Sequence, residues 1–160
     1  MTRPACYVAA PYGDPDPLIR SWNVGRACAL ARLAVAEGLA PIVVHPGIAP
    51  IYGPNGDQDP GTRALGLEVD VALVELVART VLGRLYVLET DAGELTSGTR
   101  REVRAWTAIR GRARGPARRG PWAAYRQAFR AAGLDGLWVA LEAPPNALDL
   151  VAQLRDRGIL

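Results

Sequence analysis

The sequence predicts an α/β fold, a single Rossmann-like domain in which helices flank a parallel sheet of about five strands. Short apolar runs alternate with segments of helical periodicity as far as Arg110, and glycine and proline residues separate them. The resulting β-α-β-α-β-α order favours parallel strands joined by right-handed crossovers. A chain of 160 residues suits one domain with a substantial core, so we assign residues 1–160 to a single unit.

The first strand and helix have clear local signals. Cys6–Ala10 is a short apolar run, which is typical of a buried strand. Either Asp14 or Asp16 is placed to cap a helix, with Pro17 at the first helical position. Apolar residues then recur at helical spacing over Leu18–Glu37, so an amphipathic helix is predicted there.

The middle of the chain repeats this order. Ala40–Val44 is predicted to be the second strand, and a glycine- and proline-rich loop follows as far as Gly61. A loop of this length inside a compact domain is often functional. Thr62–Ala78 has the periodicity of a second helix, and Leu85–Leu88 is predicted to be the third strand.

Beyond Arg110 the pattern changes. Residues 110–121 form an Arg/Gly/Pro-rich segment without periodicity, which predicts a loop. We expect a helix over Trp122–Ala132, a strand over Leu137–Leu141 and a last helix capped by Asn146.

Composition excludes several classes of chemistry. All nineteen basic residues are arginine, so neither a Schiff-base lysine nor a P-loop lysine exists. The single histidine, His45, excludes a histidine-rich metal site and argues against a Ser-His-Asp triad. Cys6 and Cys28 lack metal-ligand spacing, and we expect reduced thiols in a cytoplasmic protein. No apolar run approaches the roughly 18 residues of a membrane span.

The basic charge is local. Residues 1–99 carry seven arginines against eleven acids, whereas residues 100–130 carry ten arginines against one acid. Arginine is common in phosphate contacts, so a nucleic-acid-binding arm is one hypothesis. No aromatic residue interleaves the arginines before Trp122, so we favour a solvated loop and do not expect nucleic acid as a partner.

Three loops at the carboxyl ends of the expected strands bring acids and phenols to one edge of the sheet, where α/β proteins bind ligands. Glu102 is the only acid among the arginines of the helix that follows the third strand. It has two interpretations, a nucleophile or the partner of Thr99 in a capping box. Asp91 and Glu94, in the preceding loop, are expected to be solvated, and His45 is expected to bond to backbone.

Three segments resemble the nucleoside 2-deoxyribosyltransferase-like superfamily, including its small phage-associated branch. Residues 7–12, Tyr-Val-Ala-Ala-Pro-Tyr, are similar to the opening motif of the superfamily. Residues 59–67 are similar to a segment of the phage-associated branch, and residues 97–102, Ser-Gly-Thr-Arg-Arg-Glu, to the signature that ends in the catalytic glutamate. The resemblance covers about residues 5–106 and keeps the order of the three blocks.

This resemblance implies a mechanism. Glu102 would attack the anomeric carbon of a 2'-deoxynucleoside or its monophosphate and form a covalent glycosyl-enzyme, as in retaining glycosidases. Asp70 matches the second active-site carboxylate, and Tyr7 matches a tyrosine that orients the nucleophile. The residues matching substrate-binding positions are Pro11, Tyr12, Ser97, Gly98 and Thr99. No metal or organic cofactor is implied, and family members assemble as homo-oligomers, so a dimer or larger assembly is expected.

One departure keeps alternatives open. Characterised transferases carry one or two aspartates just before the signature glycine, whereas this chain has Thr96-Ser97. Those aspartates help to bind the nucleobase. Their absence weakens the transferase interpretation and leaves hydrolysis of the N-glycosidic bond open beside it. A catalytically inactive protein that binds or sequesters nucleotides is the alternative. Ser97 and its neighbours at a helix N-terminus beside Arg100 suit an anion, which favours a nucleotide over a free nucleoside.

Overall fold

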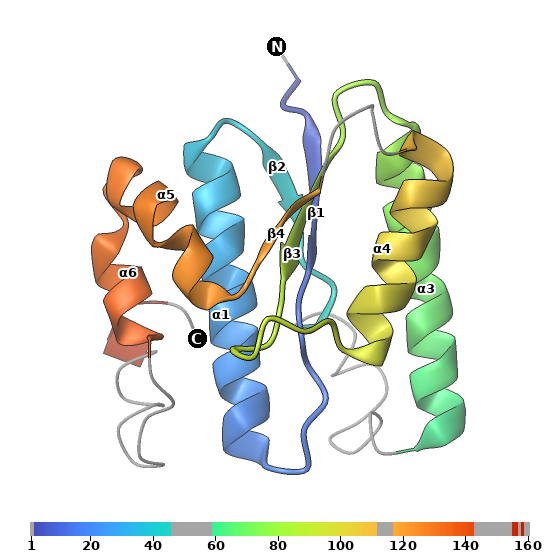
Figure 1. Ribbon diagram of the computed structural model, residues 1–160, viewed down its shortest axis with the longest axis horizontal. Helices are drawn as coiled ribbons and strands as arrows, with labels where there is room; N and C mark the ends of the chain where they lie inside the picture. The colour runs from blue at the N-terminus through green and yellow to red at the C-terminus, as the bar shows by residue number, and fades with distance from the viewer. Residues whose placement is uncertain (1, 46–58, 112–116, 143–154, 157, 159–160) are drawn as a thin grey trace.

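A computed structural model describes residues 2–45, 59–111, 117–142, 155–156 and 158. Four parallel strands form one sheet in the order β2-β1-β3-β4. They are β1 (Ala5–Ala9), β2 (Ala40–Ile42), β3 (Arg84–Leu88) and β4 (Arg118–Gly120). The sheet is the middle layer of three, with helices on both faces (Figure 1). The α/β class and the parallel sheet are therefore confirmed, with four strands in the described residues where about five were predicted.

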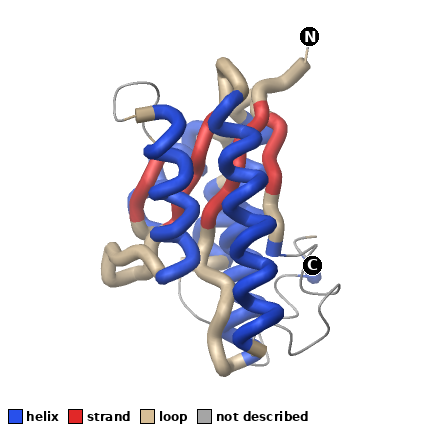
Figure 2. The backbone as a smooth tube through the Cα atoms, turned by 90° about the vertical axis from the view of Figure 1, so that its right-hand side faces the viewer, coloured by secondary structure: helices blue, strands red, loops and turns tan. Residues whose placement is uncertain are grey.

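Two long helices cover one face of the sheet, α3 (Pro60–Arg79) and α4 (Ser97–Arg110). Figure 2 shows them side by side in front of the strands. The other face carries α1 (Pro17–Ala36), the 3-10 helix η1 (Trp122–Tyr125), α5 (Arg126–Ala131) and α6 (Asp135–Ala140).

Proline and aspartate determine where the long helices begin. The Asp16 carboxylate accepts a hydrogen bond from the Leu18 amide at 2.8 Å, and Pro17 is the first residue of α1. Asp59 caps α3 in the same way, accepting from the Thr62 amide at 2.7 Å. Both caps satisfy amide groups that have no partner inside the helix, and proline lacks that amide altogether.

The alternation of side chains along the strands divides the core into two clusters. Tyr7, Leu85 and Val87 face α3 and α4, and they pack with Val74 and Trp106. The neighbouring strand residues face α1 and pack there with the aromatic residues of η1 and α5; they are Cys6, Val8, Tyr86 and Leu88. A residue's place along β1 or β3 therefore determines which cluster it joins.

The prediction of a strand over Leu137–Leu141 was wrong, because this segment belongs to α6 and the turn after it. A short apolar run has the same composition in a buried helix and a buried strand, so periodicity could not separate them. Tertiary contacts decide for the helix: Trp138 is buried, and Arg26 donates to the Leu141 carbonyl at 3.1 Å.

The Arg/Gly/Pro-rich segment also differs from its prediction, because its last residues form β4. Edge-strand pairing with β3 and two ion pairs hold this strand, Arg118 with Glu37 and Arg119 with Glu89. The helix expected over Trp122–Ala132 is present as η1 followed by α5. The loop over residues 46–58 and the cap at Asn146 lie outside the described residues.

Cys6 is fully buried and Cys28 is partly buried, and both are free thiols. Burial raises the pKa of Cys6 to about 12, which leaves it a protonated, unreactive thiol. In the described part of the chain, no helix combines the length and the apolar character that crossing a membrane requires.

Candidate active site

Tyr7 and Glu102 are in contact on the face of the sheet that α3 and α4 cover. The Tyr7 hydroxyl donates a hydrogen bond to Glu102 Oε1 at 2.6 Å, between residues 95 positions apart in the sequence. Both side chains are almost fully buried, at 1% and 2% exposure. Tyr7 comes from the middle of β1 and Glu102 from the second turn of α4. Tyr7 is thus both a packed strand residue and the hydrogen-bond partner of the carboxylate.

Asp70 completes a group of three acidic side chains. It lies on α3, is 5% exposed, and interacts electrostatically with both Tyr7 and Glu102. Its Oδ1 is buried and has no hydrogen-bond partner among the described residues. A buried oxygen without a partner costs free energy, and a catalytic role is one of the reasons for which proteins keep such a group. The three residues that the resemblance assigned to catalysis are therefore brought together from three separate elements.

Burial dominates the electrostatics of this acidic trio (Tyr7, Asp70 and Glu102). It raises the pKa of Glu102 to about 7, and the charge of Asp70 adds to that rise while the Tyr7 hydrogen bond opposes it. Burial also raises the pKa of Asp70 to about 6, again opposed by Tyr7. Burial and the two carboxylates raise the pKa of Tyr7, so its phenol stays a donor. The two interacting carboxyl groups therefore titrate near neutral pH, which suits general acid–base catalysis.

The structure excludes a capping role for Glu102. The N-cap of α4 is Thr96, whose hydroxyl accepts a hydrogen bond from the Thr99 amide at 3.3 Å. Helix α4 begins at Ser97, so Glu102 is its sixth residue and lies too far along to bond the cap amide. The capping-box interpretation with Thr99 was therefore wrong. No capping interaction explains why a carboxylate is buried at this position.

The signature residues before Glu102 have separate environments. Ser97 is exposed at the first position of α4, whereas Thr99 is buried and its hydroxyl contacts Thr96. Gly98 lies where α4 approaches α3 closely: a Cβ added at Gly98 would come within 3.2 Å of Leu67 on α3. Only Ser97 of these three presents a side-chain hydroxyl to solvent. Gly98 serves helix packing.

Pro11 and Tyr12 follow β1 at the carboxyl edge of the sheet and are both partly exposed. The Tyr12 ring stacks on His45, with ring centroids 4.9 Å apart and an interplanar angle of 11°. His45 Nε2 lies 3.0 Å from the Ala10 carbonyl, and burial lowers the pKa of the ring. The imidazole is therefore neutral, and its Nε2–H donates to Ala10. This is the backbone-bonded histidine that the sequence predicted.

Two ion pairs near this edge were not anticipated. Arg26, buried in α1 against the Trp22 ring at 3.4 Å, donates to Asp91 at 2.8 Å and so holds the loop between β3 and α4. Glu89, directly after β3, pairs with Arg119 of β4. In the sequence these acids belong to one acidic loop, and only the fold assigns each its own arginine. Glu94 is exposed, as expected.

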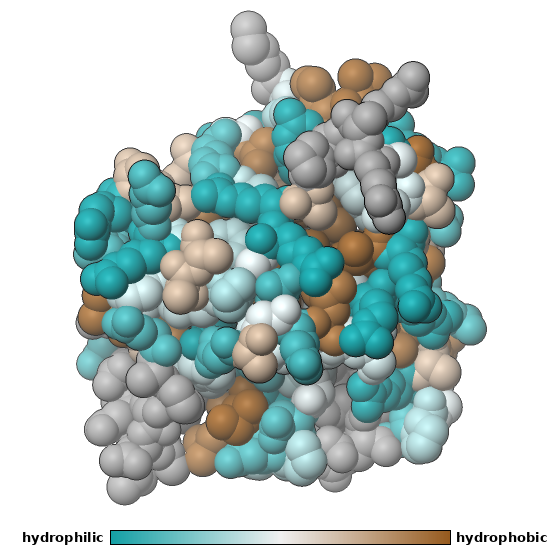
Figure 3. Space-filling model, in the orientation of Figure 1, coloured by the Kyte–Doolittle hydropathy of each residue, from teal (hydrophilic) through white to brown (hydrophobic). Residues whose placement is uncertain are grey.

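Basic side chains line the exposed side of α4. Arg100, Arg101 and Arg104 are all exposed, and Arg100 donates to the Leu95 carbonyl at 3.2 Å. Figure 3 shows hydrophilic residues over most of this view of the molecule, with apolar residues between them near its middle. The positive potential of these arginines favours an anionic ligand at the start of α4.

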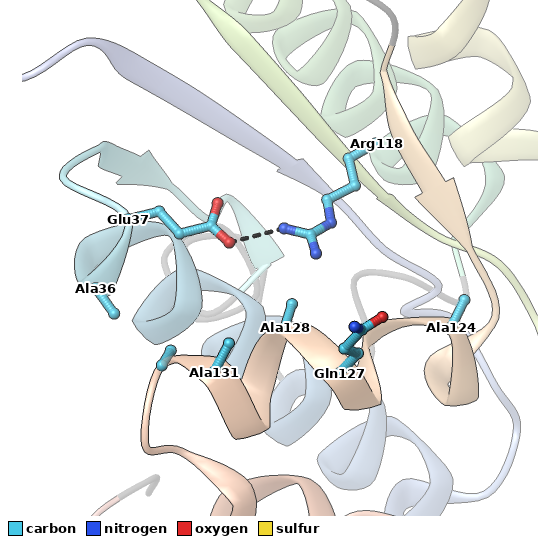
Figure 4. A pocket seen from close by; sticks show the side chains of 8 residues that line it. Ala36, Glu37, Arg118, Ala124, Gln127, Ala128 and Ala131 are labelled. Carbon is cyan, nitrogen blue, oxygen red and sulfur yellow. Dashed lines mark hydrogen bonds and ion pairs between the residues drawn. The ribbon is translucent and has the colours of Figure 1, made fainter.

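A separate hollow of about 480 Å³ lies on the α1 side of the sheet. Figure 4 shows Glu37 and Arg118 paired across it above the alanine-rich side of α5. The hollow contains none of the residues predicted for catalysis or substrate binding, and the sheet separates it from the acidic trio.

No group of three or more His, Cys, Asp or Glu side chains that could hold a metal ion occurs within the described ranges. Comparisons of the chain with protein-family models, with curated proteins and with solved structures found no match. A function for this chain therefore has to be argued from the geometry of the acidic trio and from the motif resemblance.

Proposed function

We propose that this protein cleaves or transfers the N-glycosidic bond of a 2'-deoxynucleoside or its monophosphate, with Glu102 as the nucleophile. The observation that carries the proposal is the buried 2.6 Å hydrogen bond from Tyr7 to Glu102. A buried carboxylate that makes no ion pair with any described residue and caps no helix costs stability, and a hydroxyl donor directs one of its oxygens. Nucleophilic carboxylates of retaining glycosidases perform this kind of chemistry.

In the first step a Glu102 oxygen bonds to the anomeric carbon C1′ as the bond from C1′ to the base nitrogen breaks. The electron pair of that bond leaves with the base, and Asp70 supplies the proton that neutralises it. A neutral base departs more readily than its anion. Asp70 suits this role because its raised pKa, about 6, leaves a fraction of it protonated near neutrality.

In the second step water or another base attacks C1′, and the bond between C1′ and Glu102 breaks. The Asp70 carboxylate takes the proton of the incoming nucleophile, so both carboxyl groups return to their starting states. Tyr7 keeps its proton throughout and holds Glu102 in position, because its raised pKa makes it a poor acid.

A monophosphate fits the surroundings better than a free nucleoside. Ser97 is exposed at the first position of α4, where the helix dipole and free amides attract anions. Arg100 and Arg101 are exposed one turn further on. Together these groups supply hydrogen bonds and positive charge for a phosphate.

The direct test incubates the protein with the four 2'-deoxynucleosides and their 5'-monophosphates and measures free base by chromatography. Release of base that is abolished in Glu102→Gln supports the proposal, and an acceptor base added to the mixture separates transfer from hydrolysis. If the wild-type protein releases no base from any of these compounds, the enzymatic proposal is wrong.

A second candidate function is nucleotide binding without turnover. It is favoured by Thr96, which stands where transferases carry an aspartate and whose hydroxyl is engaged in capping α4. Under this alternative, nucleotides raise the melting temperature while no base is released from any of them.

The proposal includes a homo-oligomer, as the resemblance implies. The side of α3 turned away from the sheet carries exposed apolar residues at helical spacing, Leu65, Val69 and Leu76, at 51%, 37% and 61% exposure. Apolar stripes of this kind commonly pack in subunit interfaces. Analytical ultracentrifugation of the wild type and of Leu76→Arg tests this part, since a monomeric wild type contradicts it.

A further inference from the structure

Glu89 and Arg119 lie on the same face of the sheet as the acidic trio. Side chains alternate along a strand, and Leu85 and Val87 of β3 face α3 and α4 together with Tyr7. Glu89 follows Val87 by two residues, so its side chain takes the same face. Arg119, which pairs with Val87 in the register of β3 and β4, does so too. The neighbouring Arg118 faces the opposite side and binds Glu37 there.

The pair also lies nearer to the edge where ligands enter α/β sheets. Tyr7 is paired with Leu85, and Glu89 is four residues beyond Leu85, about 13 Å at roughly 3.3 Å per residue. The Glu89 amide donates to the Gly120 carbonyl at 2.9 Å, which anchors Glu89 at the carboxyl ends of β3 and β4.

Both Glu89 and Arg119 carry hydrogen-bonding atoms that the ion pair between them does not use. The Glu89 side chain is 9% exposed, and its Oε1 accepts from Arg119 Nε. Within the described part of the chain, the second oxygen, Oε2, has no hydrogen-bond partner. The Arg119 side chain is 46% exposed, and it bonds to Glu89 through its Nε alone. A carboxylate oxygen and guanidinium N–H groups therefore stand together as an acceptor and donors.

We propose that Glu89 and Arg119 recognise the leaving base, and that the base they select carries an amino group beside a lactam, the arrangement found in guanine. This inference rests on the proposed function. The carboxylate accepts from the ring N–H and the adjacent amino group, and the guanidinium donates to the neighbouring carbonyl oxygen. Guanine presents two such donors and the carbonyl on one edge. The other common bases present one ring or amino donor on that edge.

Binding to a catalytically silent background tests the proposal without turnover. We would titrate Glu102→Gln with the 5'-monophosphates of deoxyguanosine, deoxyadenosine, deoxycytidine and thymidine by calorimetry. The guanine nucleotide is expected to bind tightest. Adding Glu89→Gln should weaken that nucleotide about tenfold or more and the others much less, because bidentate contacts discriminate between bases on this scale. Adding Arg119→Gln should likewise weaken the guanine nucleotide more than the other three, so that the four affinities become more similar.

The chain offers matched controls for both changes. Glu94→Gln removes an exposed acid of the same loop, and Arg118→Gln removes the neighbouring arginine that faces α1. Neither should alter the order of the four nucleotides. The inference is overturned if Glu89→Gln and Arg119→Gln weaken all four nucleotides equally, or lower only the melting temperature, which is the result of a purely structural ion pair. It is also overturned if another nucleotide binds tightest. If none of the four binds, the proposed function fails as well.

Discussion

Tyr7 of β1 donates a 2.6 Å hydrogen bond to Glu102 of α4, and both side chains are buried. The contact joins the middle of a strand to the second turn of a helix that begins 90 residues later. Asp70, the third member of the acidic trio, contributes a second buried carboxyl group from a third element, α3.

Replacing Glu102 by glutamine should abolish base release while the fold persists. Glutamine keeps an oxygen that can accept from Tyr7, but an amide is a poor nucleophile toward C1′. We expect a loss on the order of 10⁶-fold in turnover, the scale seen when the nucleophile of a serine protease is removed. Chromatographic assay of free base measures it, with Glu94→Gln as the control that retains activity. Unchanged turnover in Glu102→Gln excludes Glu102 as the nucleophile.

The same variant should be more stable than the wild type at neutral and alkaline pH. The pKa of Glu102 rises from 4.5 to about 7 on folding, so this group favours the folded state most below pH 4.5. That contribution is lost as pH rises through 7, and it amounts to roughly 3 kcal/mol. Denaturant unfolding at pH 4 and pH 8 measures the difference. A variant less stable than the wild type at pH 8 contradicts the burial of an ionisable glutamate.

The pH profile of wild-type base release should be bell-shaped, with its maximum between about 6 and 7. Ionisation of Glu102, with its pKa about 7, gives the rising limb, and deprotonation of Asp70, with its pKa about 6, gives the falling limb. Asp70→Asn should remove the falling limb and shift the rising limb to lower pH, since the charge of Asp70 raises the pKa of Glu102. A rising limb that stays in place shows that the two groups do not interact.

Tyr7→Phe should move the rising limb to higher pH. The Tyr7 hydrogen bond opposes the rise in the pKa of Glu102, so its loss disfavours the carboxylate. A hydrogen bond to a charged group is worth about 1.5–3 kcal/mol, and turnover near neutral pH should fall accordingly by tenfold or more. Rates measured from pH 5 to pH 9 separate the two effects. A purely structural tyrosine would lower the melting temperature and leave the profile unchanged.

Thr96→Ala should reduce stability by about 1 kcal/mol, because it removes the N-cap of α4. The rising limb of the pH profile should stay in place, since Glu102 does not take part in the cap. Denaturant unfolding and the pH profile check the two halves of this expectation. A shifted rising limb in Thr96→Ala shows that the helix start controls the carboxylate after all.

Local signals predicted much of the fold correctly. The helices with an aspartate cap followed by proline begin within two residues of their predicted starts, because a cap and a fixed proline φ act at short range. Edge strand β4 was missed because Arg118-Arg119-Gly120 has no strand composition, and the strand depends on pairing with β3. The apolar run at Leu137–Leu141 became helical because its neighbours in space pack against that form.

The sequence by itself determined the α/β class, the order of the first six elements in the described part of the chain and the short list of acids that form the candidate site. Hydrophobic periodicity and caps act within a few residues, so they are readable without the fold. Only the tertiary structure decided that Glu102 is no capping residue and that Tyr7 and Asp70 are its neighbours. Burial raises the pKa of both carboxyl groups, and burial is a property of three elements packed together rather than of any one of them.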